Sequence, residues 1–424
     1  MERLALMPKY DDYVDSGVEW LGRVPASWEL TRLGTRFNER RSKVSDIDYP
    51  ALSVTKKGVL PQLDNAAKTK DGDNRKLVKE GDFVINSRSD RKGSSGVSDR
   101  DGSVSLINIV LKPKGIHPKF SEHLLKSHAF IEEYYRVGRG IVADLWTTRY
   151  DEMRTIAISV PSLEEQTRIA NFLDKKTAQI DEAIAIKEQQ ISLLKERKQI
   201  IIQQAVTQGL DPNVPMKDSG VDWIGQIPAH WDISITKYVL RKLNRPRKKN
   251  GDTVICSNHG CSKLLGEVNQ GLVSLTQHDY QGVEIGDLLV HGMDAWHGAI
   301  AIAAHTGDCT SVVHVCDTHQ NKEYIAYFLK MLAIMNVYKV ISNGVRGNTS
   351  DFRSWSKFGE IQLILPPIDE QNSIVELLNE QIQMTDHAIE LSKQQITGLK
   401  EYKTTLINSA VTGKIKITPE MVEQ

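Results

Sequence analysis

The chain contains 424 residues, with 54 basic and 54 acidic side chains and therefore no formal net charge at pH 7. A hydrophobic fraction of 40% and a charged fraction of 25% are typical of a soluble globular protein and exclude a mainly disordered chain. The sequence has neither an apolar run of about 18 residues that would span a membrane nor the apolar core of a secretory signal, so we expect a cytoplasmic protein. Taken alone, the zero net charge argues against a nucleic-acid-binding protein.

An internal repeat organises the sequence. The motif SGVEWLGRVPASW at residues 16–28 returns as SGVDWIGQIPAHW at 219–231, an offset of 203. At an offset of 205, GDFVIN at 81–86 matches GDLLVH at 286–291, VPSLEEQTRIANFL at 160–173 matches LPPIDEQNSIVELL at 365–378, and AVT at 205–207 matches AVT at 410–412. Four matched blocks in one order predict two copies of a unit of about 205 residues.

Each copy contains a mixed segment in which short β-branched runs alternate with turn-rich loops. The predicted strands are 81–86, 104–111, 286–291 and 361–365, and the predicted helices include 122–135 and 322–338. These elements indicate an α/β (mixed α+β) domain, although the sequence leaves its topology open.

The segment that closes each copy has the 4-3 apolar spacing of a coiled-coil seam. The first seam contains Ile180, Ile184, Lys187, Ile191, Leu194, Lys198, Ile201 and Ala205, and the second contains Ile382, Thr385, Ile389, Ser392, Ile396, Leu399, Lys403, Leu406 and Ala410. Acidic residues begin each segment, and Gly209 and Gly413 stand where helix-ending glycines are expected. The first segment, 163–207, predicts a helix about 65 Å long at 1.5 Å per residue.

These helices either pack separately on their own domains or pair with each other. Pairing is favoured, because a domain of about 130 residues cannot cover a helix of about 65 Å. We expect antiparallel pairing, with Ile180 near Leu399 and Leu194 near Thr385, between two globular domains. The predicted parts are an N-terminal segment (1–28), a first globular domain (29–158), a long helix (159–210), a linker that repeats the N-terminal motif (211–231), a second globular domain (232–365), a second long helix (366–412) and a tail (413–424).

Motifs of common catalytic and metal sites are absent from the sequence. It contains no GxxxxGK[ST] phosphate loop, no HExxH metal helix, no GxSxG nucleophile elbow and no Asn-Pro-Pro-aromatic motif of an amino-methyltransferase. Cys256, Cys261, Cys309 and Cys316 have C-x4-C and C-x6-C spacings, so buried free thiols are favoured over a zinc site. We expect no catalytic residue and no metal in this chain, which leaves a binding protein.

Positive charge is concentrated in the two globular segments. Residues 29–158 hold 24 basic and 18 acidic side chains, a net of +6, and residues 232–365 hold 14 and 12, a net of +2. The second long helix, 367–412, holds 3 and 7, a net of −4. The zero total charge is therefore the sum of basic domains and acidic connecting segments, and it does not exclude DNA binding.

Basic and polar loops follow equivalent strands in the two copies, but their sequences differ, as two readers with different specificities require. Arginine pairs bidentately with guanine, and basic side chains also contact phosphates. A solvated loop or turn role remains the alternative for each candidate. The candidate DNA-binding residues are Lys56, Lys57, Arg88, Ser89, Arg91, Lys92, Arg136, Arg139, Arg241, Arg245, Arg247, Lys248, Lys249, Asn258, His259, His291, Trp296, His297, Arg346 and Asn348.

The repeated SGVxWxGxxPxxW motif, the Pro-x-x-(E/D)EQ helix start, the GD strand and the long helices ending in AVT carry a resemblance. On these motifs the chain resembles, over its full length, the specificity (S) subunit of type I restriction-modification systems. The resemblance implies two target recognition domains, each reading one half of a split, asymmetric site in double-stranded DNA, and no catalytic activity. It implies docking of two methyltransferase subunits that bind S-adenosylmethionine and two restriction/translocase subunits that use ATP and Mg²⁺. No cofactor is then expected on this chain itself.

Two other functions remain open. A fused restriction-methylation enzyme would require catalytic motifs that the sequence lacks. A coiled-coil scaffold that does not bind DNA would explain the long helices but not the duplicated basic domains.

Overall fold

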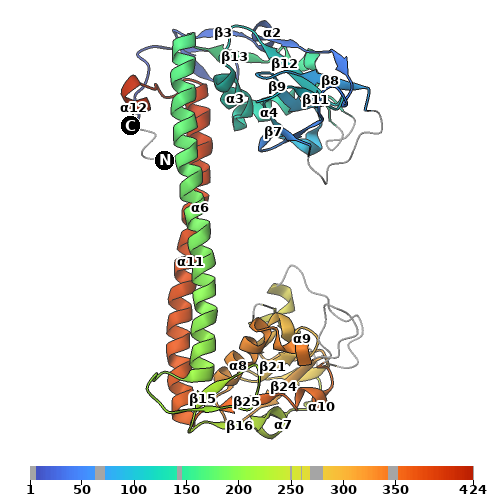
Figure 1. Ribbon diagram of the computed structural model, residues 1–424, viewed down its shortest axis with the longest axis vertical. Coiled ribbons are helices and arrows are strands. Elements are labelled where there is room, and N and C mark those ends of the chain that lie inside the picture. Colours follow the sequence, from blue (N-terminus) through green and yellow to red (C-terminus); the bar gives the residue numbers. More distant parts are fainter. Residues whose placement is uncertain are drawn as a thin grey trace. The chain divides into compact units, whose positions relative to one another are not determined.

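A computed structural model describes residues 6–62, 72–140, 146–248, 251–258, 260–267, 280–341 and 352–423. The chain divides into unit 1, Met1–Lys187 with Lys393–Gln424, and unit 2, Glu188–Ser392. This division crosses both long helices, so each unit contains one globular domain and part of each helix (Figure 1). The fold is the predicted mixed α/β architecture with a duplicated unit.

Unit 1 begins with the tryptophan–glycine motif, which forms the hairpin of β1 (Tyr13–Asp15) and β2 (Arg23–Pro25). The globular domain follows, and its first strand, β3 (Glu29–Arg32), pairs antiparallel with its last, β13 (Ala157–Val160). Between them, an antiparallel sheet has the order β10 (Ser95–Val97), β9 (Phe83–Asn86), β12 (Asn108–Pro113) and β4 (Phe37–Glu39). Strand β9 lies between β10 and β12, inside the sheet, and is buried along its whole length.

Smaller elements complete unit 1. A second sheet has the order β11 (Gly102–Val104), β8 (Arg75–Val78) and β5 (Lys43–Val44), and β6 (Leu52–Thr55) forms a hairpin with β7 (Gly58–Pro61). The short helices are α2 (Leu33–Arg36), η1 (Ser89–Arg91), α3 (Pro118–Lys126), α4 (His128–Arg136), α5 (Tyr150–Met153) and α12 (Pro419–Glu423).

Unit 2 repeats this plan at the predicted offset. Its main sheet has the order β17 (Arg241–Lys242), β24 (Val313–Asp317), β21 (Leu288–His291) and β22 (Ile300–Ile302), which corresponds to β4, β12, β9 and β10 of unit 1. The remaining strands are β14 (Met216–Asp218) with β15 (Gln226–Pro228), β16 (Asp232–Ile235) with β25 (Gln362–Leu365), β18 (Val254–Cys256) with β19 (Ser262–Leu264), and β20 (Gln281–Val283) with β23 (Gly307–Cys309). The helices are α7 (Thr236–Val239), η3 (Leu265–Glu267), η5 (Ala295–His297), α8 (Lys322–Ile334), α9 (Val337–Ile341) and α10 (Trp355–Phe358).

A buried glutamine joins each domain to its long helix, α6 (Leu163–Gln208) or α11 (Ile368–Val411). In unit 1, Gln166 donates to the Pro161 carbonyl at 2.8 Å and accepts from the His117 N–H at 2.7 Å. In unit 2, Gln371 donates to the Pro366 carbonyl at 2.8 Å and accepts from the Asn321 N–H at 3.0 Å. The glutamine of each repeated EQ sequence thus satisfies backbone groups at the start of two helices at once.

The helices pair antiparallel, as predicted. Lys403 of α11 contacts Asp181 of α6 at 2.6 Å, and Lys198 of α6 contacts Asp386 of α11 at 2.8 Å. The partner in α11 comes earlier as α6 proceeds, which defines the antiparallel direction. Every predicted seam position is buried or half-buried in its unit, including Ile180, Ile184, Ile191, Leu194, Ile201, Ile382, Ile389, Ile396, Leu399 and Leu406. Lysine side chains lean toward the start of their helix, so these ion pairs are compatible with the predicted Ile180–Leu399 register, which stays a prediction.

The ends of several elements differ from the predictions. The predicted helix 122–135 is two helices, because Ser127 ends α3 and caps α4 by accepting from the Phe130 N–H at 3.3 Å. The predicted helix 322–338 is interrupted at Asn336, whose φ of 58° is left-handed. The predicted strand 104–111 contains a turn between β11 and β12. Gly209 and Gly413 follow the long helices with φ of 75° and 71°, as predicted.

Candidate nucleic-acid interface

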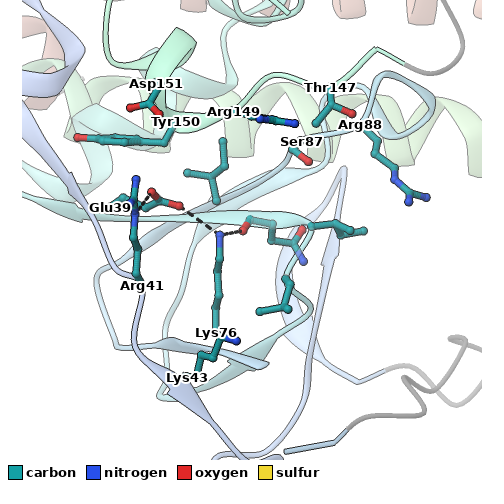
Figure 2. A pocket seen from close by; sticks show the side chains of 14 residues that line it. Glu39, Arg41, Lys43, Lys76, Ser87, Arg88, Thr147, Arg149, Tyr150 and Asp151 are labelled. Atoms are coloured by element: carbon teal, nitrogen blue, oxygen red, sulfur yellow. Dashed lines mark hydrogen bonds and ion pairs between the residues drawn. The ribbon is translucent and has the colours of Figure 1, made fainter. Parts of the chain in front are cut away.

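A cleft of about 570 Å³ lies on the globular domain of unit 1 (Figure 2). It lies where β4, β5, β8, the end of β9 and the start of β12 meet the segment that leads into α5. Five basic and two acidic side chains line it, a net of +3, together with the exposed apolar residues Leu106 and Ile107. The lining residues are Glu39, Arg41, Lys43, Lys76, Ser87, Arg88, Leu106, Ile107, Asn108, Ile109, Thr147, Arg149, Tyr150 and Asp151.

The basic side chains of this cleft fall into a paired and an unpaired group. Arg41 and Lys76 both contact the half-buried Glu39, at 2.6 and 3.2 Å, and Lys76 also donates to the Asn108 carbonyl. Lys43, Arg88 and Arg149 are exposed, and their side chains have no hydrogen bond or ion pair with any part of the chain that the structure describes. The dashed lines of Figure 2 accordingly join Glu39 to Arg41 and to Lys76, and none reaches Arg88 or Arg149. The unpaired side chains are available to an external anion or base.

Arg88 and Arg139, two candidates of unit 1 that are distant in the sequence, lie on either side of Thr147. Thr147 forms isolated antiparallel bridges with Arg88 on one side and Arg139 on the other. Its neighbour Thr148 donates from its N–H to the Ser87 carbonyl at 2.9 Å and exchanges hydrogen bonds with Tyr134. Burial raises the pKa of the Tyr134 hydroxyl, so it stays a neutral donor. The loop that carries Arg88 and Ser89 is therefore held by a fixed backbone framework.

The other candidates of unit 1 are exposed, and most are in ion pairs. Arg91 is 3.7 Å from Asp90, Lys92 is 2.7 Å from Glu132, and Arg139 is 3.4 Å from Glu152. Arg136 contacts Glu133 at 2.5 Å, and this hydrogen bond raises the pKa of the guanidinium. The Arg91–Asp90 and Lys92–Glu132 pairs are exposed on both sides, and such pairs are weak and can exchange for phosphate contacts.

Lys56 and Lys57 form the exposed turn between β6 and β7. This hairpin lies against β10, where a Cβ on Gly96 would be 2.9 Å from the Gly58 Cα. Glycine at position 96 therefore permits the close approach. The hairpin that carries the two lysines therefore packs on the strand that follows the Arg88–Lys92 loop in the chain.

In unit 2 the basic run after α7 is largely neutralised by acidic neighbours. Arg241 contacts Asp317 at 2.8 Å. Hydrogen bonds from Lys322, which has the larger effect, and from Arg241 lower the pKa of the Asp317 carboxyl to about 2. Arg247 is 3.5 Å from Asp308, and Lys248 is 3.7 Å from Glu284. Among the described residues of this run, Arg241, Arg245, Arg247 and Lys248 thus each have an acidic partner.

Arg245 has a structural partner that recurs in unit 1. It contacts both carboxylate oxygens of the buried Asp287, one of them at 3.1 Å, and Asp287 also accepts from the Glu284 N–H at 2.8 Å. At the equivalent place, Arg40 contacts both oxygens of the buried Asp82 at 2.6 and 3.0 Å, and Asp82 accepts from the Lys79 N–H. The aspartate of each GD strand is therefore an anchor for an arginine, and we assign Arg245 to the framework.

The remaining described candidates of unit 2 lie around η5. Trp296 is half-buried against the core, and its ring lies 3.7 Å from that of the exposed His297 and 4.9 Å from the Lys339 ammonium. Asn258 is exposed in the turn between β18 and β19, and its carbonyl lies beside Gly298 at the end of η5. His291 is half-buried and accepts from the Asp294 N–H at 3.1 Å, and burial lowers its pKa. It therefore holds the η5 loop rather than extending into solvent.

Four candidates, Lys249, His259, Arg346 and Asn348, lie outside the described residues. Lys43, Arg41 and Arg149 of the unit 1 cleft were missed by the sequence reasoning. Arg41 and Lys43 lie in the short basic run Arg40-Arg41-Ser42-Lys43, which could have indicated them, whereas Arg149 belongs to no basic run and follows no GD strand.

No cluster of three or more His, Cys, Asp or Glu side chains within the described ranges is arranged to hold a metal ion. The four cysteines are free thiols; Cys256, Cys309 and Cys316 are buried, and burial raises the pKa of each of these three to about 12. Of the helices in the described part of the chain, none is both long and apolar enough to cross a membrane.

Comparison with known proteins identifies a family and a curated protein that are similar to this chain. Residues 32–196 match the family "Type I restriction modification DNA specificity domain". The chain is 23% identical to the specificity subunit of the type I restriction enzyme MjaVIII of Methanocaldococcus jannaschii, over 93% of this chain and 94% of that protein.

Two solved structures share the fold. A chain from a type I R-M system, studied for its complex assembly and conformational transition, has a TM-score of 0.68 at 15% identity and covers 92% of this chain and 98% of its own length. The HsdS subunit from Thermoanaerobacter tengcongensis has a TM-score of 0.55 at 15% identity, with the same coverage.

The duplicated α/β unit and the antiparallel long helices are the fold that the chain shares with these two solved structures. Residues 32–196 form a type I restriction modification DNA specificity domain, and the chain is similar over nearly its whole length to a specificity subunit of a type I restriction enzyme.

Proposed function

We propose that this chain reads a bipartite, asymmetric DNA target, with one half-site for each globular domain. The proposal rests on one observation: the two units share a framework but differ where side chains face solvent. Arg88 and Arg149 of the unit 1 cleft correspond, at the offset of 205, to Met293 and Ser354 of unit 2. Strands β9 and β21 and helices α5 and α10 fix this correspondence. Two domains with one backbone plan and unlike contact residues would recognise unlike sequences.

We propose further that the chain binds no cofactor and acts with methyltransferase subunits that carry S-adenosylmethionine and restriction/translocase subunits that use ATP and Mg²⁺. The distance between half-sites would then be set by the paired helices, with centres roughly one DNA turn, about 34–36 Å, apart. Shortening both helices by one heptad is expected to shorten the permitted gap, and an unchanged gap would contradict this role of the helices.

An exposed apolar face of the helices in unit 2 supports docking of a helical partner. Leu193 and Ile200 of α6 are one heptad apart, and so are Leu377, Met384 and Leu391 of α11. All five are 38–60% exposed, although each is a large apolar side chain. Four of them lie two positions after a seam residue, and Leu377 lies one heptad before Met384, so all five occupy the same heptad position.

The antiparallel arrangement places both rows on one face. A two-fold axis that relates antiparallel helices is perpendicular to the plane of the pair, so equivalent positions face the same side. A partner helix with its own apolar heptad stripe would bury both rows. We propose that the methyltransferase subunit supplies this helix.

The bipartite proposal is tested by sequencing methylated adenines in cells that carry this chain and its methyltransferase. We expect two short specified half-sites separated by unspecified bases. A contiguous motif would contradict the two-reader function. Methyl transfer by the purified chain alone would instead support a fused enzyme, and absent or salt-insensitive DNA binding by the chain–methyltransferase complex would support a scaffold.

The docking face is tested with Leu193→Glu combined with Leu391→Glu, measured by co-purification with the methyltransferase. Loss of the complex is expected, with the free chain's unfolding free energy changed by no more than about 0.5 kcal/mol, because both side chains are exposed. Gln199→Glu combined with Gln203→Glu, at two exposed positions of α6 outside these rows, is the charge-matched control. Unchanged co-purification of the double variant would exclude this face as the docking surface.

A further inference from the structure

We infer that the unit 1 cleft recognises guanine, and that Arg88 and Arg149 are its specificity-determining residues. This inference rests on the proposed bipartite function and adds the class of half-site that one of the two domains reads. It concerns a G·C-containing half-site, in which the guanine presents O6 and N7 as paired acceptors in the major groove.

Arg88 and Arg149 differ from most of the other arginines of this domain in having free guanidinium groups. Arg40, Arg41, Arg91, Arg100, Arg136 and Arg139 each have a carboxylate within 3.7 Å. Neither Arg88 nor Arg149 has such a partner among the described residues, and both are exposed. A guanidinium without a carboxylate keeps all five donors for an external acceptor and pays no cost for breaking an internal pair.

The backbones that carry these arginines are held firmly. The Arg88 N–H donates to the Asn86 side chain at 3.0 Å, and Arg88 is bridged to Thr147. The Arg149 N–H donates to Glu152 at 3.1 Å, at the start of α5. Side chains that extend from a fixed backbone lose less entropy on binding than side chains on a loose loop, which is the requirement for discrimination between bases.

The remaining lining of the cleft fits a base edge better than a phosphate alone. Leu106 and Ile107 are 41% and 39% exposed beside the cleft, where they offer apolar contact to a thymine methyl or a base edge. Lys43 is exposed and unpaired within the described chain, so a phosphate contact can be assigned to it separately. Figure 2 shows Arg88 and Arg149 on the opposite side of the cleft from Lys43.

Unit 2 does not repeat the pair, since Met293 and Ser354 stand at the equivalent positions. The guanine requirement is therefore assigned to one half of the target only. This asymmetry makes the inference specific, because a general electrostatic role would affect both halves alike.

The test compares methylated-adenine motifs for the wild type, Arg88→Ala and Arg149→Ala in cells that carry the methyltransferase. Each variant is expected to lose base specificity at one position of the same half-site, and the wild type should require a G·C pair at that position. The other half-site should be unchanged. Loss of one bidentate contact should reduce discrimination at that position by roughly 5- to 150-fold. Arg100→Ala, which removes an exposed arginine paired to Asp99 at 2.7 Å outside the cleft, should leave the whole motif intact.

The inference would be overturned if the variants lost specificity at an A·T pair, if neither variant changed the motif, or if methylation fell equally for all sequences. In each of these cases a bipartite wild-type motif would still support the proposed function. A contiguous wild-type motif would overturn the function itself. Co-purification of each variant with the methyltransferase shows that the complex has assembled. If methylation falls below detection, binding of that complex to oligonucleotides substituted at each position provides the same readout.

Discussion

The Arg245–Asp287 ion pair allows a direct distinction between a framework residue and a DNA contact. The sequence places Arg245 in a basic run, whereas the structure gives it the buried carboxylate of Asp287. Replacing Arg245 with alanine leaves that carboxylate with only the Glu284 N–H as a hydrogen-bond donor among the described residues. We expect the unit 2 domain to lose stability, because a buried charge without its partner is poorly solvated.

The expected loss follows from the burial of the two side chains. Removing one partner of a fully buried ion pair costs about 3–5 kcal/mol. The Asp287 side chain is 5% exposed but that of Arg245 is 30% exposed, so solvent offsets part of this cost. We expect about 2–3 kcal/mol, which for a unit of this size lowers the Tm by roughly 5–10 °C.

Hydrogen exchange under increasing denaturant separates the two units and is the appropriate assay. Arg245→Ala should weaken protection in β21 and β24, and Arg40→Ala should do the same in β9 and β12 of unit 1. Arg241→Ala, which removes a 75% exposed side chain, should change stability by no more than about 0.5 kcal/mol. An Arg245→Ala protein with unchanged protection that no longer recognises one half-site would refute the framework role and restore Arg245 as a DNA contact.

Three further measurements follow from the packing and the charges. Leu406→Ala in the buried seam should lower the unfolding free energy of unit 1 by about 2–4 kcal/mol in chemical denaturation. Thr404→Ala, at an exposed position of the same helix, should change that free energy by about 0.5 kcal/mol or less, and equal effects of the two variants would contradict the seam. Hydrogen bonds from His123 and Lys119 lower the pKa of Asp174 to about 2, so its stabilising contribution is present above about pH 4 and is lost as the pH falls toward 2. Asp174→Asn should therefore lower the Tm at pH 7 but not at pH 2, and a difference that persists at pH 2 would exclude this cause. Lys56→Ala with Lys57→Ala should weaken DNA binding of the methyltransferase complex equally for all sequences and reduce the salt slope by up to about two phosphate contacts, whereas a sequence-selective loss would indicate base reading.

The duplicated fold could be predicted from the sequence because its determinants are local or periodic. Offsets close to 205 carry over to most of the strands and helices, since each repeated block encodes the same backbone element. The seam was predictable because helix periodicity alone decides which side chains face the partner helix. The breaks at Ser127 and Asn336 were not predicted, because the apolar pattern continues across both residues.

The candidate interface was less predictable, because the charge state of a surface depends on residues distant in sequence. Arg245 and Asp287 are 42 positions apart, so a basic run by itself cannot indicate which of its members are free. The reverse holds for Arg149, which lies outside every basic run but is placed in the cleft by the bridges of Thr147 to Arg88 and Arg139. Local composition identified the basic domain, whereas tertiary pairing decided which cations remain available.

The distribution of repeated residues explains how one fold can hold two specificities. Side chains that recur in both copies, such as Asp82 with Asp287 and Gln166 with Gln371, are buried and hydrogen-bond to an arginine or to backbone groups of their own unit. Substituting any of them would leave a buried polar group unsatisfied, at a cost of about 1–3 kcal/mol or more. Arg88 and Arg149 have no such internal partner within the described chain, so their replacement by Met293 and Ser354 in the other copy costs the fold little. Recognition can therefore change at these positions while the backbone that presents them stays the same.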